Sequence, residues 1–260
     1  MSKIKIKNIL KKKGKKPIVC LTAYSKPIAE ILDKYCDIIL VGDSVGMVLY
    51  GMQTTKKVKL QTMIDHAATV KKATRKSLVV FDMPYKTYTN KKVAYKNAKK
   101  VIRATKCDAI KLEGGKNIIN IINYLIKKKI PVMGHIGLLP QYSEKFKLKG
   151  KNLKERKKIL DDAMVLSNSG VFAIVIECVV EDLAKKITSI VSVPTIGIGA
   201  SKYCDGQILV TDDVVGLSNF SPKFVKRYSN IKEIIEKSVK KYCSDIKSKK
   251  FPSNKNVYKF

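Results

Sequence analysis

Short β-branched runs alternate with stretches of helical periodicity from residue 18 onward. Between the runs, apolar residues recur three and four positions apart, as at Ala94, Ala98 and Val101. This alternation predicts parallel strands joined by crossover helices, an α/β fold. Eight strands in one uninterrupted series favour a closed (β/α)8 TIM barrel, with an open doubly wound sheet as the alternative. The runs occupy residues 18–22, 38–41, 78–81, 109–112, 132–134, 173–176, 195–198 and 208–210.

The length of the chain fits one such barrel. Its 260 residues match the roughly 250 typical of a single (β/α)8 domain. We therefore expect one barrel domain over residues 1–260, or at most two small domains, with a basic lead at 1–16 and a loosely held tail at 249–260. A last helical pattern around Ile231, Ile235 and Val239 is expected to pack outside the ring, and the lysine run at 11–16 to be solvated.

The formal net charge is +32, from 53 basic and 21 acidic residues. A surplus of this size raises nucleic acid as a partner, because Lys and Arg neutralise phosphates. However, only four of the basic residues are Arg, the better reader of bases and phosphates, and the lysines are spread along the whole chain. Biased genomic base composition explains the surplus better. We expect no nucleic-acid partner, keep a nucleic-acid-binding protein as the alternative class, and place the excess charge on the outer helices.

Six cysteines, at positions 20, 36, 107, 178, 204 and 243, show no C-x-x-C pair and no zinc-site spacing. Several lie inside apolar runs, as reduced buried thiols do, which predicts a cytoplasmic protein. No apolar stretch approaches the roughly 20 residues of a membrane span. The lysine-rich start also lacks the apolar stretch of a signal peptide, so we expect no membrane partner.

Ionisable side chains follow five consecutive apolar runs. In a (β/α)8 barrel the active site is built at the carboxyl ends of the strands. A single acid after a strand is as often a helix cap or a turn residue. Five successive strands that carry such groups at one rim predict a shared site instead. These groups are Asp43, Asp82, Lys111 with Glu113, His135, and Glu177.

The acids of this rim suit a magnesium site. Asp43, Asp82 and Glu113 are hard oxygen ligands with no Cys or His among them. Mg²⁺ takes one or two carboxylates together with water and substrate oxygens. A divalent ion that binds a 2-oxo acid acidifies the adjacent carbon, so a nearby base can form an enolate. Glu177, which lies between two apolar residues, is the candidate base, because an apolar setting raises a carboxylate pKa toward working pH.

Lysine and histidine at the rim have less specific roles. Lys111 is a candidate to bind the substrate carboxylate or to stabilise enolate charge. Alternatively, it is a buried lysine that pairs with Glu113 for structure alone. His135 is expected to line the pocket or to help a proton transfer. A structural role in the core, or in support of other site residues, is an equal alternative. The second histidine, His66, lies inside a helical pattern and is interpreted as structural.

A hydrolase pattern overlaps the same rim. Residues 42–46, Gly-Asp-Ser-Val-Gly, satisfy G-x-S-x-G, and Ser44, Asp82 and His135 follow the order of an α/β-hydrolase triad. A nucleophile elbow needs a helix to begin at once, whereas we expect a long loop until the helical pattern near Leu60. No HGGG-type segment for an oxyanion hole precedes it. A serine hydrolase is therefore disfavoured.

Several longer sequence blocks carry a family resemblance. They are LTAY at 21–24, VGDSVGM at 41–47, KLEGG at 111–115, GHIGL at 134–138, IECV at 176–179, and IGIGA at 196–200 with DGQILV at 205–210. In this order they resemble the ketopantoate hydroxymethyltransferase family, from about residue 16 to residue 226.

The resemblance implies a (β/α)8 barrel of the phosphoenolpyruvate/pyruvate type, assembled as a cytoplasmic homodecamer. It also implies transfer of a hydroxymethyl group from 5,10-methylenetetrahydrofolate to 3-methyl-2-oxobutanoate, which gives 2-dehydropantoate in pantothenate and coenzyme A biosynthesis. The folate and the branched substrate come from the resemblance alone. The alternative is another Mg²⁺-dependent enolate-forming enzyme of the same barrel type, such as a C–C lyase.

The family's functional positions fall on residues of the expected types. By resemblance, Asp43 and Asp82 are Mg²⁺ ligands, and Glu113 completes the metal site directly or through water. The contacts to the 2-oxo acid fall on Asp43, Ser44, Asp82 and Lys111, and the proton acceptor falls on Glu177. Ser44 then becomes a hydroxyl that binds the substrate carboxylate, which accounts for the hydrolase-like pattern.

Three positions depart from the family pattern. Ser25, Leu139 and Ser201 stand where Asp, Thr and Gly are usual, and the loop at 142–150 is short and Lys-rich. None of these positions is a metal ligand or the base. They therefore bear on loop closure and folate affinity more than on the reaction itself.

Overall fold

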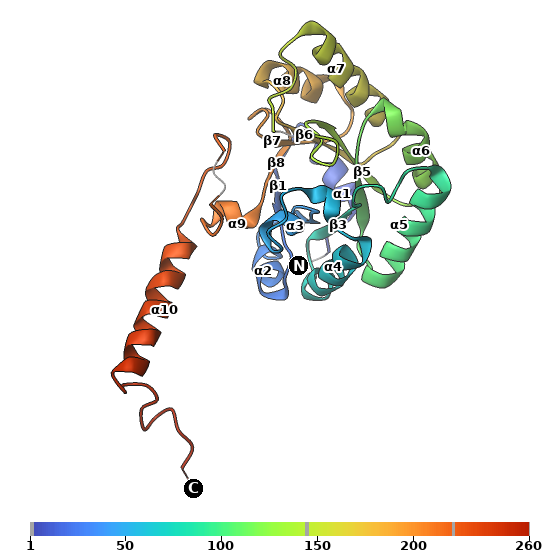
Figure 1. The fold of residues 1–260 in the computed structure, drawn as a ribbon. Coiled ribbons are helices and arrows are strands. Elements are labelled where there is room, and N and C mark those ends of the chain that lie inside the picture. Colours follow the sequence, from blue (N-terminus) through green and yellow to red (C-terminus); the bar gives the residue numbers. More distant parts are fainter. Residues whose placement is uncertain (1–2, 144–145, 220–221, 260) are drawn as a thin grey trace. The chain divides into compact units, whose positions relative to one another are not determined.

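The computed structural model describes residues 3–143, 146–219 and 222–259. Within these ranges, eight parallel strands pair in chain order and the last returns to the first, which closes a barrel (Figure 1). This confirms the closed barrel over the open sheet. The strands are β1 (Ile18–Thr22), β2 (Ile38–Val41), β3 (Leu78–Asp82), β4 (Ala109–Glu113), β5 (Val132–Gly137), β6 (Ala173–Glu177), β7 (Thr195–Ile198) and β8 (Gly206–Leu209).

Helices surround the strands, as the 3.6-residue periodicity predicts. In α5, apolar or small side chains at Ala94, Ala98 and Val101 are buried on one stripe, and the Asn90 side chain caps the helix by accepting from the Val93 N–H at 3.0 Å. The elements of this part are α1 (Ile6–Leu10), α2 (Lys26–Leu32), α3 (Val45–Val48), η1 (Thr55–Lys57), α4 (Leu60–Ala73), α5 (Lys91–Thr105), η2 (Lys116–Ile118), α6 (Ile119–Lys127), α7 (Leu153–Asn168) and α8 (Glu181–Ile190).

Three strands continue one residue past the apolar runs that predict them. β3, β4 and β6 end at Asp82, Glu113 and Glu177. In register, Asp82 pairs with Lys111 and Glu113 pairs with His135. Hydrophobicity marks a strand only as far as its last apolar residue, but backbone pairing continues through the polar residue that follows. These ionisable groups therefore stand on the barrel wall and not on loops.

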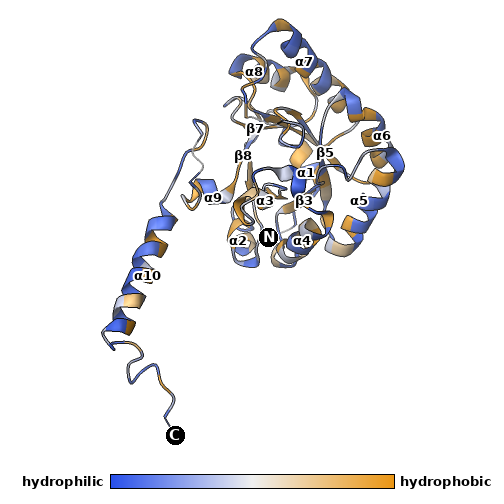
Figure 2. Cartoon of the chain, viewed as in Figure 1, coloured by the Kyte–Doolittle hydropathy of each residue, from blue (hydrophilic) through white to orange (hydrophobic). Residues whose placement is uncertain are grey.

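The core has two parts, which follow from the alternation of side chains along each strand. One cluster fills the barrel interior and includes Ile18, Ile38 and Val80. The other lies between strands and helices and includes Phe81, which is fully buried. Figure 2 shows the same division, with hydrophobic colour on the strands and hydrophilic colour on the outer faces of the helices.

The lead segment closes the amino end of the barrel, which its lysine-rich sequence did not predict. α1 places Ile9, with no exposed surface, in the interior cluster. Lys12 and Lys13 pair with Asp37 at 2.6 Å and with Asp205 at 2.9 Å, two acids that immediately precede strands β2 and β8. The expectation of a wholly solvated run at 11–16 is therefore wrong for these two lysines.

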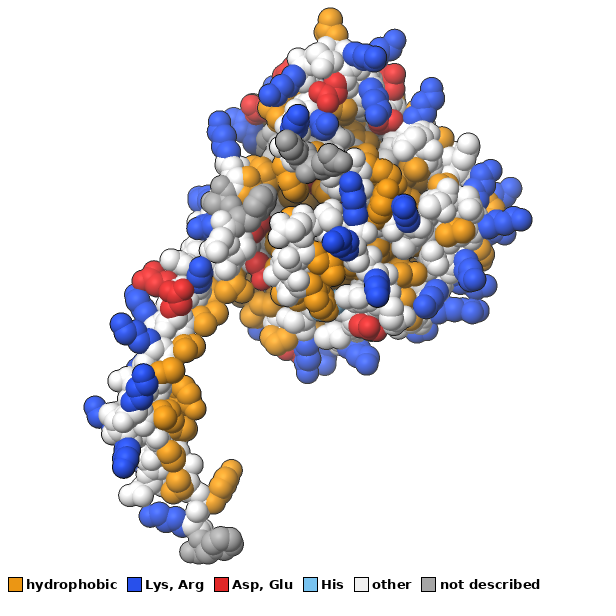
Figure 3. Space-filling view, viewed as in Figure 1, with side chains coloured by type: hydrophobic (Ala, Val, Ile, Leu, Met, Phe, Trp, Pro, Cys, Tyr) orange, Lys and Arg blue, Asp and Glu red, His pale blue; other side chains and the backbone are white. Residues whose placement is uncertain are grey.

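Most other lysines of the barrel lie on its outside, as expected. Lys91, Lys92 and Lys96 of α5 are exposed, as are Lys154 and Lys157 of α7. Figure 3 shows Lys and Arg side chains scattered over the surface without a single dense patch on the face in view. The face in view therefore offers no focused basic surface of the kind that nucleic-acid-binding proteins use.

The chain divides into two compact units, one up to Val210 and one from Thr211. The second unit contains α9 (Thr211–Val214) and α10 (Ile231–Lys247). The expected last helix is therefore present, and the Asn230 side chain accepts from the Glu233 N–H at its start. α10 has no buried residue, and the described residues after it are exposed through residue 259. Packing of this helix on the ring, and a single domain over 1–260, stay predictions.

The described residues contain neither a membrane-spanning helix nor a disulfide bond. No helix in them combines the length and apolarity needed to cross a bilayer. The six cysteines are unpaired, and all but Cys243 are buried. Burial raises the pKa of the Cys20 thiol well above its usual range, as expected of an inert thiol in a core.

Candidate active site

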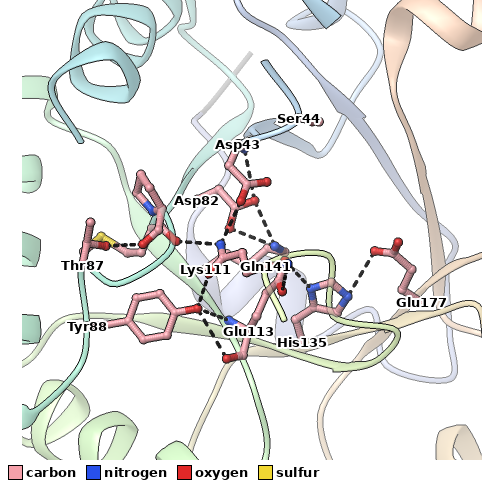
Figure 4. A network of polar contacts seen from close by, with 12 residues as sticks. Asp43, Ser44, Asp82, Thr87, Tyr88, Lys111, Glu113, His135, Gln141 and Glu177 are labelled. Atoms are coloured by element: carbon pink, nitrogen blue, oxygen red, sulfur yellow. Dashed lines mark hydrogen bonds and ion pairs between the residues drawn. The ribbon is translucent and has the colours of Figure 1, made fainter. Parts of the chain in front are cut away.

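Five consecutive strands bring their ionisable side chains to one place, at the carboxyl end of the barrel (Figure 4). The side chains are buried: Glu113 and His135 are 1% exposed and Asp82 is 2% exposed. Asp43, two residues beyond β2, is also buried. The ionisable residues predicted at the carboxyl ends of the strands therefore lie in a single cluster.

Lys111 is paired with Asp82. Its Nζ donates to both carboxylate oxygens, at 2.8 Å and 3.0 Å. Burial alone would lower the pKa of Lys111, but the carboxylates of Asp82, Glu113 and Asp43 outweigh burial and raise it. Lys111 is therefore a cation in the apo protein. The alternative of a structural pair with Glu113 is wrong, because the partner is Asp82.

Asp43 and Asp82 form a close acid pair. The Asp43 N–H donates to Asp82 Oδ2 at 3.4 Å. Burial and the charge of Asp82 raise the pKa of Asp43 to about 7, against the opposing effects of Lys111, Gln141 and Thr55. Two buried carboxylates whose charges interact in this way favour a bound cation.

Gln141 ties these acids together and was not selected from the sequence. Its Nε2 donates to Asp43 Oδ2 at 2.8 Å and to the Met83 carbonyl at 3.0 Å, and its backbone N–H donates to Glu113 Oε2 at 3.0 Å. Tyr88 donates to Gln141 Oε1 at 2.5 Å. Gln141 has no exposed surface. Gln141 follows β5 by four residues, so a search for ionisable residues directly after strands does not find it. Its one sequence signal is its place after the GHIGL block.

His135 lies between two carboxylates. Its Nδ1 is 3.6 Å from Glu113 Oε1 and its Nε2 is 3.2 Å from Glu177 Oε2. Neither ring nitrogen meets hydrogen-bond geometry. Burial and nearby Lys111 lower the pKa of His135 well below its usual value, so the ring is neutral. The structure therefore places His135 in the buried cluster, beside the candidate base.

Glu177 faces the cluster from β6. Burial raises its pKa to about 7, and Lys111 opposes that rise only in part. The segment after β5 approaches its backbone closely, since the Leu138 N–H donates to the Glu177 carbonyl at 2.8 Å. Gly137 makes this approach possible: its φ is +91°, and a Cβ there would lie 2.4 Å from the same carbonyl oxygen. Glu177 thus has the pKa that a general base needs near neutral pH.

Ser44 does not form a hydrolase triad. A helix, α3, does begin directly after it, so the long loop expected at this point is wrong. However, the strands close a barrel instead of the open sheet of an α/β-hydrolase. The Ser44 hydroxyl shares a hydrogen bond with the Tyr24 hydroxyl, at 2.7 Å. His66 bonds the Tyr24 carbonyl at 2.7 Å and Tyr50 at 2.9 Å, which agrees with a structural role.

The acid cluster fits a magnesium ion only if other oxygens contribute. Among the residues that the structure describes, no three His, Cys, Asp or Glu side chains are gathered tightly enough to hold an ion by themselves. The close pair of Asp43 and Asp82 supplies two carboxylates, and Glu113 is engaged by Gln141 and faces His135. Proteins usually bind Mg²⁺ through one or two carboxylates, and water and substrate oxygens complete its coordination.

Comparison with known sequences decides the family. The sequence matches ketopantoate hydroxymethyltransferase over residues 3–254. The chain belongs to this family. A 3-methyl-2-oxobutanoate hydroxymethyltransferase of Pelagibacter ubique (strain HTCC1062) is 58% identical over 254 residues, which cover 98% of this chain and 99% of that protein. One of Phenylobacterium zucineum (strain HLK1) is 48% identical over 255 residues, 96% and 93% of the two chains. The resemblance is confirmed, and the chain is a hydroxymethyltransferase enzyme.

Solved structures agree on the fold. A phosphonopyruvate hydrolase superposes with a TM-score of 0.64 at 10% identity, over 98% of this chain and 93% of that one. A 2,3-dimethylmalate lyase, a member of the PEP mutase/isocitrate lyase superfamily, gives 0.60 at 12% identity, over 78% and 79%. At these identities the likeness shows the fold alone. It confirms the TIM barrel.

None of the departures from the family pattern falls on one of the clustered carboxylates. Ser25 is the residue before α2, and Ser201 accepts a hydrogen bond from the Tyr203 N–H at 3.1 Å. Leu139 lies between β5 and Gln141. Within the loop at 142–150, residues 144–145 lie outside the described residues.

Proposed function

We propose that this hydroxymethyltransferase uses 5,10-methylenetetrahydrofolate and 3-methyl-2-oxobutanoate and forms 2-dehydropantoate, for pantothenate and coenzyme A biosynthesis. The observation that carries the proposal is the buried side-chain cluster at the carboxyl end of the barrel. It holds a buried cation, Lys111, and a buried carboxylate with a pKa of about 7, Glu177. Family membership and the relatives' names support the substrate. The assignment of each residue is our proposal.

The 2-oxo acid binds against Asp43, Ser44, Asp82 and Lys111. Lys111 is charged before the substrate arrives, so it can receive the substrate carboxylate or the oxygen that gains negative charge. Asp43 and Asp82 would hold Mg²⁺, and Glu113 would join through a water molecule. When bound, the ion would draw electron density from the keto carbonyl and acidify C3 of the substrate.

Glu177 takes the proton from C3. Its position on β6 is fixed by backbone pairing, and its carboxylate is half ionised near neutral pH. The electron pair of the C–H bond becomes the enolate, whose C3 forms a bond to the methylene carbon of the folate. Both carbon–nitrogen bonds of that methylene break and leave tetrahydrofolate. Water supplies the hydroxyl oxygen of the product. The two nitrogens receive one proton each, one from that water and one from protonated Glu177. His135, neutral and 3.2 Å from Glu177, lines the path of the proton.

The proposal extends to the enzyme's oligomeric state and its location in the cell. By resemblance to its family, the enzyme is a homodecamer of the cytoplasm with small-molecule substrates and no nucleic-acid or membrane partner. The scattered lysines and the unpaired buried cysteines support this assignment.

A product assay tests the proposed function. The protein is incubated with Mg²⁺ and both substrates, and 2-dehydropantoate is measured by mass spectrometry. We expect one 2-dehydropantoate for each tetrahydrofolate formed. Turnover of 3-methyl-2-oxobutanoate without folate consumption, or no 2-dehydropantoate with both substrates present, would contradict the proposal. The first of these results would favour other enolate chemistry of the same barrel type.

A further inference from the structure

Tyr24 follows β1 by two residues, at the carboxyl end of the barrel, next to the strand β2 that leads to Ser44. Its side chain is buried, with 5% of the residue exposed. The hydroxyl groups of Tyr24 and Ser44 share the hydrogen bond of 2.7 Å. Figure 4 shows Ser44 beside Asp43, at the border of the buried cluster. The bond therefore links a buried phenol to the residue that would bind the substrate carboxylate.

Ser44 does not use its hydroxyl in the way that its position favours. It is the residue before α3, where a serine side chain normally accepts from a backbone N–H of the first turn. Here the side chain makes no such bond and is directed to Tyr24 instead. Gly42 leaves room for this orientation, because a Cβ there would lie 2.7 Å from Ser44 Oγ. The serine hydroxyl thus lies beside the phenol and does not cap the helix.

The direction of this hydrogen bond matters for the ligand. In a pair of hydroxyl groups, the phenol is the stronger acid and the alcohol oxygen is the better acceptor. The favoured arrangement therefore has Tyr24 donating to Ser44 Oγ. Serine has a single O–H, and this arrangement leaves that O–H available for another acceptor. The reverse arrangement would direct the only proton of Ser44 at Tyr24, and none would be left for a bound anion.

His66 of α4 holds the backbone of Tyr24. Its Nδ1 lies 2.7 Å from the Tyr24 carbonyl oxygen, which can only accept, so Nδ1 carries the hydrogen. In the neutral ring Nε2 is then the acceptor, and it lies 2.9 Å from the Tyr50 hydroxyl. A contact on each side of the ring fixes His66, which in turn fixes the segment that carries the phenol.

We propose that Tyr24 is a positioning residue for the reaction: its hydroxyl donates to Ser44 Oγ and so turns the Ser44 proton toward the carboxylate of the 2-oxo acid. The inference rests on the proposed function, in which Ser44 binds that carboxylate. A hydroxyl that is already oriented needs no reorganisation when the acid binds, which lowers the Kd. Because Tyr24 acts on the carboxylate end and not on C3, its loss should affect binding more than proton removal by Glu177.

A double-mutant cycle tests this role. Calorimetric titration with 3-methyl-2-oxobutanoate, with Mg²⁺ and without folate, gives the Kd for the wild type, Tyr24→Phe, Ser44→Ala and the double variant. We expect Tyr24→Phe, which keeps the buried ring, to raise the Kd about fivefold, and Ser44→Ala to raise it about twentyfold. The double variant should match Ser44→Ala, because the oxygen through which Tyr24 acts is gone. Tyr35→Phe, at an exposed position after α2, is the control and should match the wild type.

Exchange of the C3 proton in D2O gives a second readout, which a merely structural role would not split in the same way. At saturating 2-oxo acid, Tyr24→Phe should exchange within about twofold of the wild-type rate, while the concentration for half-maximal exchange rises with the Kd. A Tyr24→Phe variant that binds like the wild type, or whose full loss adds to that of Ser44→Ala, would overturn the inference and leave the proposed function standing. A wild-type protein that neither binds the acid nor exchanges its proton would overturn both.

Discussion

Both carboxylate oxygens of Asp82 accept hydrogen bonds from Lys111, at 2.8 Å and 3.0 Å. The pair joins the last residue of β3 to the middle of β4, and it lies where both groups are shielded from water. A metal ion at Asp82 must therefore share that carboxylate with a lysine. Lys111 in turn keeps its charge in the absence of substrate, which preorganises the pocket for an anion.

Replacement of Lys111 should destabilise the fold strongly. Lys111→Met leaves Asp43, Asp82 and Glu113 without their common cation, and loss of one partner of a buried pair costs about 3–5 kcal/mol. Urea unfolding measures the change. Lys26→Met removes one partner of an exposed pair with Glu30 and should cost less than about 1 kcal/mol. Equal losses for the two variants would show that the buried pair carries no special stability.

The raised pKa of Glu177 predicts a pH-dependent stability. Its pKa rises from 4.5 to about 7, so the folded state holds a proton that the unfolded state releases between these values. Wild-type stability should therefore fall as pH rises from about 4.5 to 7. Glu177→Gln cannot ionise and should be more stable than wild type at pH 8, by about 3 kcal/mol. The two should converge near pH 4.

Thermal unfolding across this pH range checks that expectation. Glu181→Gln, at an exposed position at the start of α8, is the control and should follow the wild-type curve. A constant difference between Glu177→Gln and wild type from pH 4 to pH 8 would show that Glu177 does not titrate in this range.

Gln141 should control the affinity for magnesium. Gln141→Met keeps the size of the side chain but removes the donor to Asp43, so the carboxylate loses its orientation. Loss of such a supporting contact typically weakens metal binding 10–100-fold. The concentration of Mg²⁺ that gives half-maximal C3 exchange measures this. Gln61→Met, on α4 beside Asp65, is the control and should leave that concentration unchanged. An unchanged requirement in Gln141→Met would refute the role.

Gly137 should tolerate no side chain. In Gly137→Ala the new Cβ would lie 2.4 Å from the Glu177 carbonyl oxygen, at a φ of +91°. Gly14→Ala has a comparable φ of +62° but open space around the Cβ, so it isolates backbone strain of about 1 kcal/mol. We expect Gly137→Ala to lose about 3 kcal/mol or more in urea unfolding. Similar losses for both would mean that strain alone, and not the approach to Glu177, requires glycine.

The barrel and the candidate site at its rim were predictable because each strand carries a local hydrophobic pattern. Asp82, Glu113 and Glu177 directly follow apolar runs, and parallel strands bring such positions to one rim whatever the helices between them look like. The prediction of the substrate and of the folate came from the family resemblance, because residue spacing alone does not identify either molecule.

The features that were missed depend on contacts distant in the chain. α1 and α3 are five and four residues long, too short for periodicity to register, and they owe their stability to packing such as that of Ile9 inside the barrel. Lys12 and Lys13 look solvated until Asp37 and Asp205 come beside them. Gln141 is polar, lies in a loop, and becomes significant only when the loop folds back onto Asp43.

The most direct test of the account follows the C3 proton of 3-methyl-2-oxobutanoate by NMR in D2O, with Mg²⁺ and without folate. If Glu177 removes that proton, the wild-type protein exchanges it for deuterium, and exchange stops on chelation of Mg²⁺. Glu177→Gln should lose at least about a hundredfold in rate, the usual contribution of a general base. A wild-type protein that leaves the proton in place, or a Glu177→Gln variant that exchanges it at the wild-type rate, would contradict the mechanism.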